Sequence, residues 1–438
     1  MDPIRTGPDA CPGTLQLHQA ADGPLARVRV PGGELPVAAL RALATDLGDG
    51  SIELTSRANI QVRALRDPTA FATRIAAAGL LPSPTHERVR NILASPLTGL
   101  GPHGTLDIRP LLTALDHGLC AHAPLAALPG RFLFALDDGT GDVAALGADV
   151  TALPVPGSIA ILLAGIDHGF RCSAESAVQL MLAAAECFLA ERTAQNSQAW
   201  RLAELQDGPA RIAARLASNQ TSAPEVDPSP GDRNSPETAG PPPVGVVSLR
   251  DGTYAIGVAV PLGRLSAGQV EALARVAGPG GVVRLTPWRG VVVVGLSAEA
   301  VAAAEVTLGN AGLVSDPRSP WVGITACTGR PGCAKSLTDV RADARASVAG
   351  ASELRPVSWA VGRVGADPDR QPEGRVEQAG GSRPVHWAGC ERRCGRPRGE
   401  VVDVVAVPEG YRVEFEGVSR TYRELDAVVG DVRSRRLW

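Results

Sequence analysis

Short segments near the N-terminus alternate apolar and polar residues, and two stretches between them have helical spacing. Alternation predicts strands with one buried face, and apolar residues three and four apart predict an amphipathic helix. The predicted elements are, in order, strands over 14–18 and 25–30, a helix over 35–47, an alternating strand region over 51–63, and a helix over 68–80. This order predicts a small α+β unit over residues 10–80.

The same pattern of elements recurs over residues 244–314. Leu54-Thr-Ser-Arg57 aligns with Leu285-Thr-Pro-Trp-Arg289 if one inserted residue is allowed. Two unrelated α+β segments with similar turns are the alternative, but the shared Leu-Thr and Arg favour a repeat. An internal repeat of this length predicts two copies of one unit, packed about a pseudo-twofold axis. The predicted elements of the second copy are strands over 245–249 and 254–260, a helix over 265–277, and a strand pair over 281–294.

The rest of the chain divides by composition. A long helix over 173–192 and a hairpin signal at Asp137-Asp-Gly-Thr-Gly-Asp142 predict an α/β domain over residues 85–215. Residues rich in Pro, Ser, Glu and Gly cannot bury a core, so we expect a linker over 217–243 and a second insertion over 366–384. A second α/β domain is then expected over 318–438.

Composition excludes several classes of function. The net charge of −3 over 438 residues leaves no basic footprint for nucleic acid. No apolar run reaches the length of a membrane span, and the N-terminus lacks the apolar region of a signal peptide. We therefore expect a soluble cytoplasmic protein, in which thiols stay reduced. That compartment disfavours disulfides and favours a metal role for grouped cysteines.

Four of the eight cysteines lie in two short loops, spaced Cys327-x5-Cys333 and Cys390-x3-Cys394. Zinc prefers pairs two to four residues apart, so zinc fits only the second pair. A wide loop followed by a tight one suits a [4Fe-4S] cubane, whose corners lie further apart than the ligands of one zinc ion. The spacing alone leaves a [4Fe-4S] cluster, a zinc site, two disulfides or buried thiols open, with the cluster ahead of zinc.

These cysteine loops resemble the cluster signature of the sirohaem-dependent sulfite and nitrite reductases. The resemblance implies that Cys327, Cys333, Cys390 and Cys394 bind one [4Fe-4S] cluster, and that Cys394 also bridges to a sirohaem iron where sirohaem is present. Three more segments resemble motifs of that family, which are Leu54–Gln61, Val89–Gly99 and Leu128–Phe132. The implied fold is α+β and sulfite/nitrite reductase-like: two ferredoxin-like half-units about a pseudo-twofold axis, plus two α/β domains, the second carrying the cluster.

In sulfite reductases, two arginines and two lysines of these three motifs surround the bound oxyanion. Arg57, Arg90 and Arg131 match three of the four positions, whereas the fourth is Leu133, which carries no charge. Each arginine taken alone is also consistent with a solvated surface residue. The residues predicted to bind substrate are Arg57, Asn59, Gln61, Arg90, Asn91, Arg131, Arg289 and Lys335, the last being the only lysine of the chain.

Three features resemble the precorrin-3B synthase branch of that family. They are the missing cation, the modest length and the run Leu128-Pro-Gly-Arg-Phe-Leu-Phe-Ala-Leu-Asp-Asp-Gly139. The resemblance implies an O2-dependent hydroxylation of precorrin-3A at C20, with closure of a γ-lactone. It further implies electrons from a ferredoxin or an NAD(P)H-linked reductase, passing through the cluster, and a mononuclear non-haem iron. The sequence assigns no ligand of that iron and no catalytic acid or base. The alternatives are a sirohaem-dependent sulfite or nitrite reductase, and a non-enzymatic iron–sulfur or zinc-binding scaffold.

Overall fold

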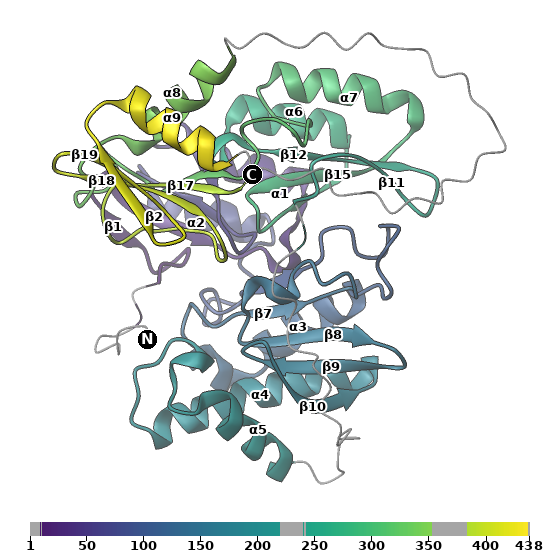
Figure 1. The fold of residues 1–438 in the computed structure, drawn as a ribbon. Helices are drawn as coiled ribbons and strands as arrows, with labels where there is room; N and C mark the ends of the chain where they lie inside the picture. The colour runs from purple at the N-terminus through teal and green to yellow at the C-terminus, as the bar shows by residue number, and fades with distance from the viewer. Residues whose placement is uncertain (1–8, 10, 220–239, 241, 353–382, 437–438) are drawn as a thin grey trace. The chain divides into compact units, whose positions relative to one another are not determined.

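The computed structural model describes residues 9, 11–219, 240, 242–352 and 383–436 (Figure 1). Backbone contacts divide the chain into two compact units, residues 1–317 and residues 318–438. Among the described residues, none of the helices combines the length and apolar character that a membrane span requires. The linker predicted over 217–243 and the insertion predicted over 366–384 lie almost wholly outside the described residues.

The first half-unit is a five-stranded sheet covered by two helices. Its strand order is β1-β2-β5-β4-β13, where β13 is Arg264–Ser266, and every neighbouring pair is antiparallel. Helix α2 begins after Asp67, whose carboxylate accepts the N–H of Ala70 at 2.9 Å, with Pro68 at the first helical position. The elements are β1 (His18–Ala20), β2 (Gly23–Val28), α1 (Val37–Leu43), β4 (Ser51–Leu54), β5 (Ile60–Val62) and α2 (Pro68–Ala77).

The second half-unit repeats this arrangement with the strand order β11-β12-β15-β14-β3, where β3 is Glu34–Pro36. Helix α6 begins with a capping box, in which Ser266 and Gln269 each bond the backbone N–H of the other. The elements are β11 (Gly245–Ser248), β12 (Tyr254–Ala259), α6 (Ala267–Ala277), β14 (Val282–Leu285), β15 (Gly290–Leu296) and α7 (Ala298–Asn310).

Each half-unit lends a short strand to the other. Strand β3 (Glu34–Pro36) follows β2 in the chain but pairs with β14, and β13 (Arg264–Ser266) follows β12 but pairs with β4. Short 3-10 turns, Pro31–Gly33 and Pro261–Gly263, precede the two exchanged strands. The exchange is reciprocal, which is the arrangement expected of two copies about a pseudo-twofold axis. One apolar core spans both copies and includes Leu35, Leu40, Leu265 and Leu273.

A third sheet lies between the half-units in the sequence and has the order β10-β9-β8-β7-β6. Strands β6, β7 and β8 are parallel to one another, whereas β9 and β10 each run antiparallel to their neighbour. The elements are β6 (Ile92–Ala94), α3 (Arg109–Ala121), β7 (Phe134–Leu136), β8 (Val150–Val155), β9 (Ser158–Leu163), β10 (Ile166–Cys172), α4 (Ala174–Ala194) and α5 (Gly208–Asn219). The hairpin predicted at 137–142 is wrong, because the strands on either side of this turn are parallel.

The second unit has a sheet of the same design. Its order is β16-β17-β18-β19-β20, with two parallel pairings followed by two antiparallel ones. The elements are β16 (Ile324–Ala326), α8 (Val340–Ser352), β17 (Val385–Ala388), β18 (Val402–Val407), β19 (Gly410–Phe415), β20 (Val418–Tyr422) and α9 (Leu425–Arg436). Trp387 is fully buried in this sheet and packs edge-on against Tyr411 at 5.3 Å between ring centroids.

Candidate functional site

The three motifs with candidate arginines meet at one backbone carbonyl, that of Gly130. Asn91 donates its amide N–H to this oxygen at 2.9 Å, and Arg57 approaches it with Nη1 at 3.5 Å. The amide of Asn59 in turn donates to Asn91 Oδ1 at 3.1 Å. Both asparagines are buried, so these bonds are shielded from water and fix the three segments against one another. Asn59 and Asn91 therefore assemble the site in this structure.

The turn between β4 and β5 carries Arg57. Thr55 Oγ1 accepts the backbone N–H groups of Arg57 and Asn59, at 3.3 and 3.1 Å. Ala58 has a left-handed backbone with φ of 52°, which an L-residue adopts only where the surroundings impose it. The turn is thus held from inside by a threonine, which sets the position of Arg57.

Arg57 lies in a group of like charges. Burial is the main cause that lowers its pKa, to about 9, and the nearby guanidinium groups of Arg201, Arg131 and Arg29 lower it further. Motif matching identified Arg57 and Arg131 but not Arg29 or Arg201. We call Arg29, Arg57, Arg131 and Arg201 the arginine cluster. Several guanidinium groups that act on one buried arginine are the kind of surroundings that favour an anion.

Two members of the arginine cluster are held by the loop before α5. The guanidinium of Arg131 lies over the ring of Trp200, 5.9 Å from its centroid. Arg201 donates Nε to Asp149 Oδ2 at 2.6 Å and Nη2 to the carbonyl of Gly147. Adjacent residues of one loop therefore contact or form part of the cluster, although the sequence of this loop contains no recognisable motif.

Arg90 lies outside the arginine cluster. Its guanidinium forms a two-pronged ion pair with Asp116 on α3, with distances of 2.7 and 2.6 Å, and the arginine is buried. It is not among the charged groups that act most strongly on Arg57. A bidentate pair of this kind satisfies most of the guanidinium donors, so the geometry assigns Arg90 a bracing contact to α3.

Gln61 belongs to a polar row that crosses the first sheet. Its side chain accepts from Arg27 Nη2 and donates to Glu53 Oε2, each at 2.9 Å, and Arg27 and Glu53 are its direct cross-strand partners. Glu53 in turn lies opposite Arg264 of the exchanged strand. Gln61 therefore links two charged side chains within the sheet.

The structure corrects the alignment of the two copies at the turns. Thr286 Oγ1 accepts the N–H of Gly290 at 3.1 Å, as Thr55 Oγ1 accepts that of Asn59, and Arg289 has a φ of 58°, as Ala58 has 52°. Thr286 thus matches Thr55, with no residue inserted between Leu285 and Arg289. The counterpart of Arg289 is Ala58, and the counterpart of Arg57 is Trp288. The sequence alignment paired Arg57 with Arg289, but Arg289 lies one position later in its turn than Arg57 does.

The four candidate cysteines follow two adjacent parallel strands. Cys327 comes directly after β16, and Cys390 comes two residues after β17. Burial is the main cause that raises the pKa of Cys327, and Cys394 and Cys333 raise it further. The pKa of Cys394 is raised in the same way, with Cys390 and Cys333 among the causes. The structure therefore brings all four thiols into one group.

The size of this group differs from that of a zinc site. Four thiolates on one zinc ion, with bonds of about 2.3 Å, lie ~3.8 Å from one another. Among the described residues, no three of these four sulfur atoms all lie within 4.8 Å of one another. The Sγ atom of Cys327 accepts the N–H of Gly389 at 3.1 Å, a contact that favours a thiolate. The described thiols are therefore not as close together as the four ligands of a single zinc ion.

Ion pairs join the second cysteine loop to the sheet. Arg393 bonds Asp403 Oδ2 at 3.2 Å and also contacts Glu414, and Arg396 bonds both oxygens of Asp403 at 3.0 and 2.8 Å. Asp403 is buried, so its charge depends on these partners. Lys335 lies two residues after Cys333, next to the buried Ser336, and is exposed.

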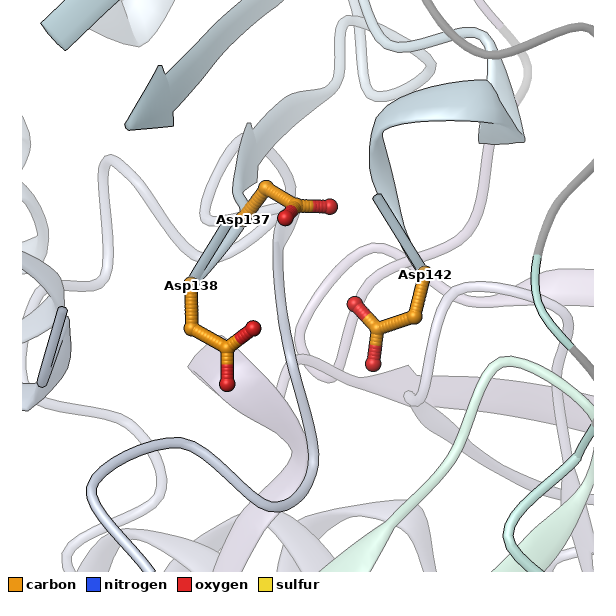
Figure 2. A group of neighbouring side chains, drawn as sticks. All are labelled: Asp137, Asp138 and Asp142. Atoms are coloured by element: carbon orange, nitrogen blue, oxygen red, sulfur yellow. The ribbon is translucent and has the colours of Figure 1, made fainter. Parts of the chain in front are cut away.

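Figure 2 shows a group of three carboxylates after β7, from Asp137, Asp138 and Asp142, whose ligand atoms lie within 4.8 Å of one another. Asp137 accepts four backbone N–H groups, between 2.8 and 3.1 Å, from residues 139, 141, 143 and 144. Asp142 accepts from Ser95 Oγ at 2.5 Å. These bonds explain the acidic residues as the supports of a tight turn.

Comparison with known proteins agrees with this geometry. A family model described as the nitrite/sulfite reductase ferredoxin-like half domain matches residues 248–310, which lie in the second half-unit. A curated precorrin-3B synthase from Sinorhizobium sp. is 26% identical over 427 residues, covering 94% of this chain and 83% of that protein. The resemblance to the sulfite and nitrite reductase family is confirmed. A ferredoxin–nitrite reductase from Synechococcus elongatus is 37% identical over 126 residues, which is 26% of this chain and 25% of that protein.

The sulfite/nitrite reductase fold is also seen in a solved structure, that of the Mycobacterium tuberculosis NirA protein. The TM-score is 0.71 at 20% identity, with 93% of this chain and 79% of that chain covered. The predicted fold class is therefore confirmed: an α+β chain with two ferredoxin-like half-units and two α/β sheets. Sulfite and nitrite reductases usually carry an iron–sulfur cluster and sirohaem.

Proposed function

We propose that this chain is a precorrin-3B synthase of aerobic cobalamin biosynthesis. The reaction takes precorrin-3A, O2, two electrons and two protons. One oxygen atom becomes the hydroxyl at C20, a ring A acetate closes as a γ-lactone on C1, and the other oxygen atom leaves as water. The similarity over 94% of the chain supports this proposal. The observation that carries it is the arginine cluster, at which Leu133 replaces the fourth cation of the oxyanion-binding enzymes.

The chemistry of the arginine cluster suits a polycarboxylate tetrapyrrole. Precorrin-3A carries acetate and propionate groups, and a guanidinium binds a carboxylate through two parallel hydrogen bonds. In this proposal Arg57 and Arg131 each hold one carboxylate of the substrate. The bonds from Asn59 and Asn91 toward Gly130 keep the two arginines at a fixed separation before substrate arrives. Such preorganisation lowers the entropic cost of orienting the macrocycle.

The four cysteines fit the cluster that the proposal requires. Cys327, Cys333, Cys390 and Cys394 would hold a [4Fe-4S] cluster, which supplies electrons one at a time to the site. The protein contributes the N–H of Gly389 toward Cys327 and the ion pairs of Arg393, which hold the loops in position.

The part of the chain that the structure describes offers no clear ligand set for a mononuclear non-haem iron. Such irons typically use two histidines and one carboxylate. Among the described residues, the compact group of metal-binding side chains consists of aspartates only, and the backbone occupies Asp137. These residues do not fit that iron, and we derive no step through it. The electron donor is proposed to be a ferredoxin or an NAD(P)H-linked reductase.

The test is anaerobic titration of precorrin-3A into the wild type and Arg57→Ala. Loss of a charged hydrogen bond typically costs ~1.5–3 kcal/mol, so we expect the affinity to fall roughly ten- to a hundredfold. Arg57→Lys should recover part of the loss, because lysine lacks the planar fork. The matched control is Arg66→Ala, an exposed arginine of the same half-unit. Equal affinities of the wild type and Arg57→Ala would contradict the carboxylate role.

A second candidate function is a sirohaem-dependent sulfite or nitrite reductase, which the nitrite reductase relative favours. The two functions differ in whether a tetrapyrrole stays bound as a cofactor. Extraction of the purified protein with acidic acetone decides between them. Recovery of one sirohaem per chain would establish the reductase, and turnover of precorrin-3A without sirohaem would establish the synthase.

A further inference from the structure

The resemblance to the sulfite reductases implies a cation where this chain has Leu133. The side chain of Leu133 is 3% exposed and belongs to the apolar core shared by the half-units. Its backbone N–H donates to Asp149 Oδ2 at 2.7 Å. The residue is therefore committed to packing and to supporting a buried carboxylate.

The same carboxylate holds an arginine from another part of the chain. Asp149 Oδ2 accepts Arg201 Nε at 2.6 Å, and Oδ1 accepts the N–H of Leu202 at 2.7 Å. The Asp149 side chain is 1% exposed, and that of Arg201 is 13% exposed. Asp149 thus joins the backbone of residue 133 to the side chain of Arg201, and it fixes Arg201 near the position where the cation is missing.

The members of the arginine cluster differ in the groups that they contact. Asp149 pairs with Arg201, whereas Arg57 is directed at the carbonyl of Gly130. Arg29 is 2% exposed, and its Nη1 has no hydrogen-bond partner among the described residues. A buried N–H without a partner is costly, and an anion bound here would satisfy it. Arg201 is also the charged neighbour that lowers the pKa of Arg57 most.

We propose that Arg201 supplies the fourth cation of the substrate site and binds a carboxylate of the substrate beside Arg57 and Arg131. This inference rests on the proposed function for the identity of the ligand. The shared chemistry is that of a planar or pyramidal oxyanion, and a carboxylate of a tetrapyrrole and a free sulfite ion both have it. Asp149 is a positioning residue, since it holds Arg201 and contacts no ligand in this proposal.

The experiment measures anaerobic binding of two probes, uroporphyrin I, which is an octacarboxylate tetrapyrrole, and sulfite. The proteins are the wild type, Arg201→Gln, Arg201→Lys and Arg211→Gln. Arg211 is the matched control, because it lies in the following helix, is exposed, and pairs with the buried Glu191 at 3.5 Å. We expect Arg201→Gln to weaken uroporphyrin binding about tenfold or more, Arg201→Lys to restore part of it, and Arg211→Gln to leave it unchanged.

Thermal melting separates folding from binding, because Arg201→Gln leaves Asp149 without its ion pair. Arg201→Lys keeps the positive charge and remains testable if Arg201→Gln fails to fold. If the wild type binds uroporphyrin and a folded Arg201 variant binds it with the same affinity, the inference is overturned and the proposed function stands. Sulfite binding without uroporphyrin binding overturns the proposed function. In that case, weaker sulfite binding by Arg201→Gln would still support Arg201 as an oxyanion ligand. Unchanged sulfite binding would overturn both the inference about Arg201 and the proposed function.

Discussion

The sheets β6–β10 and β16–β20 have the same strand order but different residues where the strands end. Ser95 follows β6 and Cys327 follows β16. Ser95 N–H donates to the carbonyl of Leu136 at 3.2 Å, and Cys327 N–H to that of Trp387 at 2.9 Å. Ser95 Oγ accepts the N–H of Asp138 at 3.0 Å, and Cys327 Sγ accepts that of Gly389 at 3.1 Å. Ser95 Oγ therefore occupies the position in the sheet β6–β10 that Cys327 Sγ occupies in the sheet β16–β20.

The loops after the second strand of each sheet also correspond. Asp137 gathers backbone N–H groups into a tight turn in one sheet, whereas Asp403 gathers two arginines of the cysteine loop in the other. A buried carboxylate organises the loop in both cases. The strand framework thus fixes where polar groups converge, and the residue types decide between a hydrogen-bonded turn and a group of thiols.

The largest expected effect is on the thiols. Cys327→Ser should abolish iron and sulfide binding, and bleach the iron–sulfur absorbance, because oxygen is a poor ligand for this cluster and the loops depend on it for stability. Ser95→Ala is the matched variant in the other sheet, and its iron content should equal that of the wild type. Chemical assay of iron and sulfide on both proteins is the measurement. Full iron and sulfide in Cys327→Ser would remove this cysteine from the cluster.

The next effect concerns the carboxylates that organise the loops. Asp403→Asn weakens the bonds to Arg393 and Arg396 and should lower the free energy of unfolding of the second unit by ~1.5–3 kcal/mol. Iron should then be lost faster to a chelator. Asp137→Asn should also destabilise the protein but leave the rate of iron loss unchanged. If both variants lost iron at the same rate, the loop contacts of Asp403 would have no specific part in holding the cluster.

The sequence allowed much of this architecture to be predicted, because periodicity and cysteine spacing are local signals. Helices α1, α2, α4 and α6 and most strands of the two half-units were predicted from apolar spacing, and the group of four thiols follows from two short loops. The exchanged strands β3 and β13 were not predicted, because three residues carry no period and their pairing is set by the other copy. Arg29 and Arg201 were missed because only the folded chain brings them beside Arg57. Asp149, which positions Arg201, lies in no motif.

The smallest expected effect distinguishes the acidic turn from the thiol loop by its response to pH. Burial is the main cause that raises the pKa of Asp142, to about 7, and the charges of Asp137 and Asp138 add to it. An unfolded aspartate has a pKa of about 3.9, so between about pH 4 and pH 7 the folded protein binds more protons. Stability from this group is therefore present at low pH and is lost as the pH rises toward 7.

Asp142→Asn removes that dependence while keeping an acceptor for Ser95. We expect the variant to be more stable than the wild type at pH 8 by ~1–3 kcal/mol, with a much smaller difference at pH 5. Asp107→Asn is the control of opposite sign, because the hydrogen bond from Arg109 lowers the pKa of Asp107. Melting temperatures at both pH values are the measurement. A gain of the same size at pH 5 and pH 8 would show that the repulsion within the acidic turn is not what Asp142→Asn relieves.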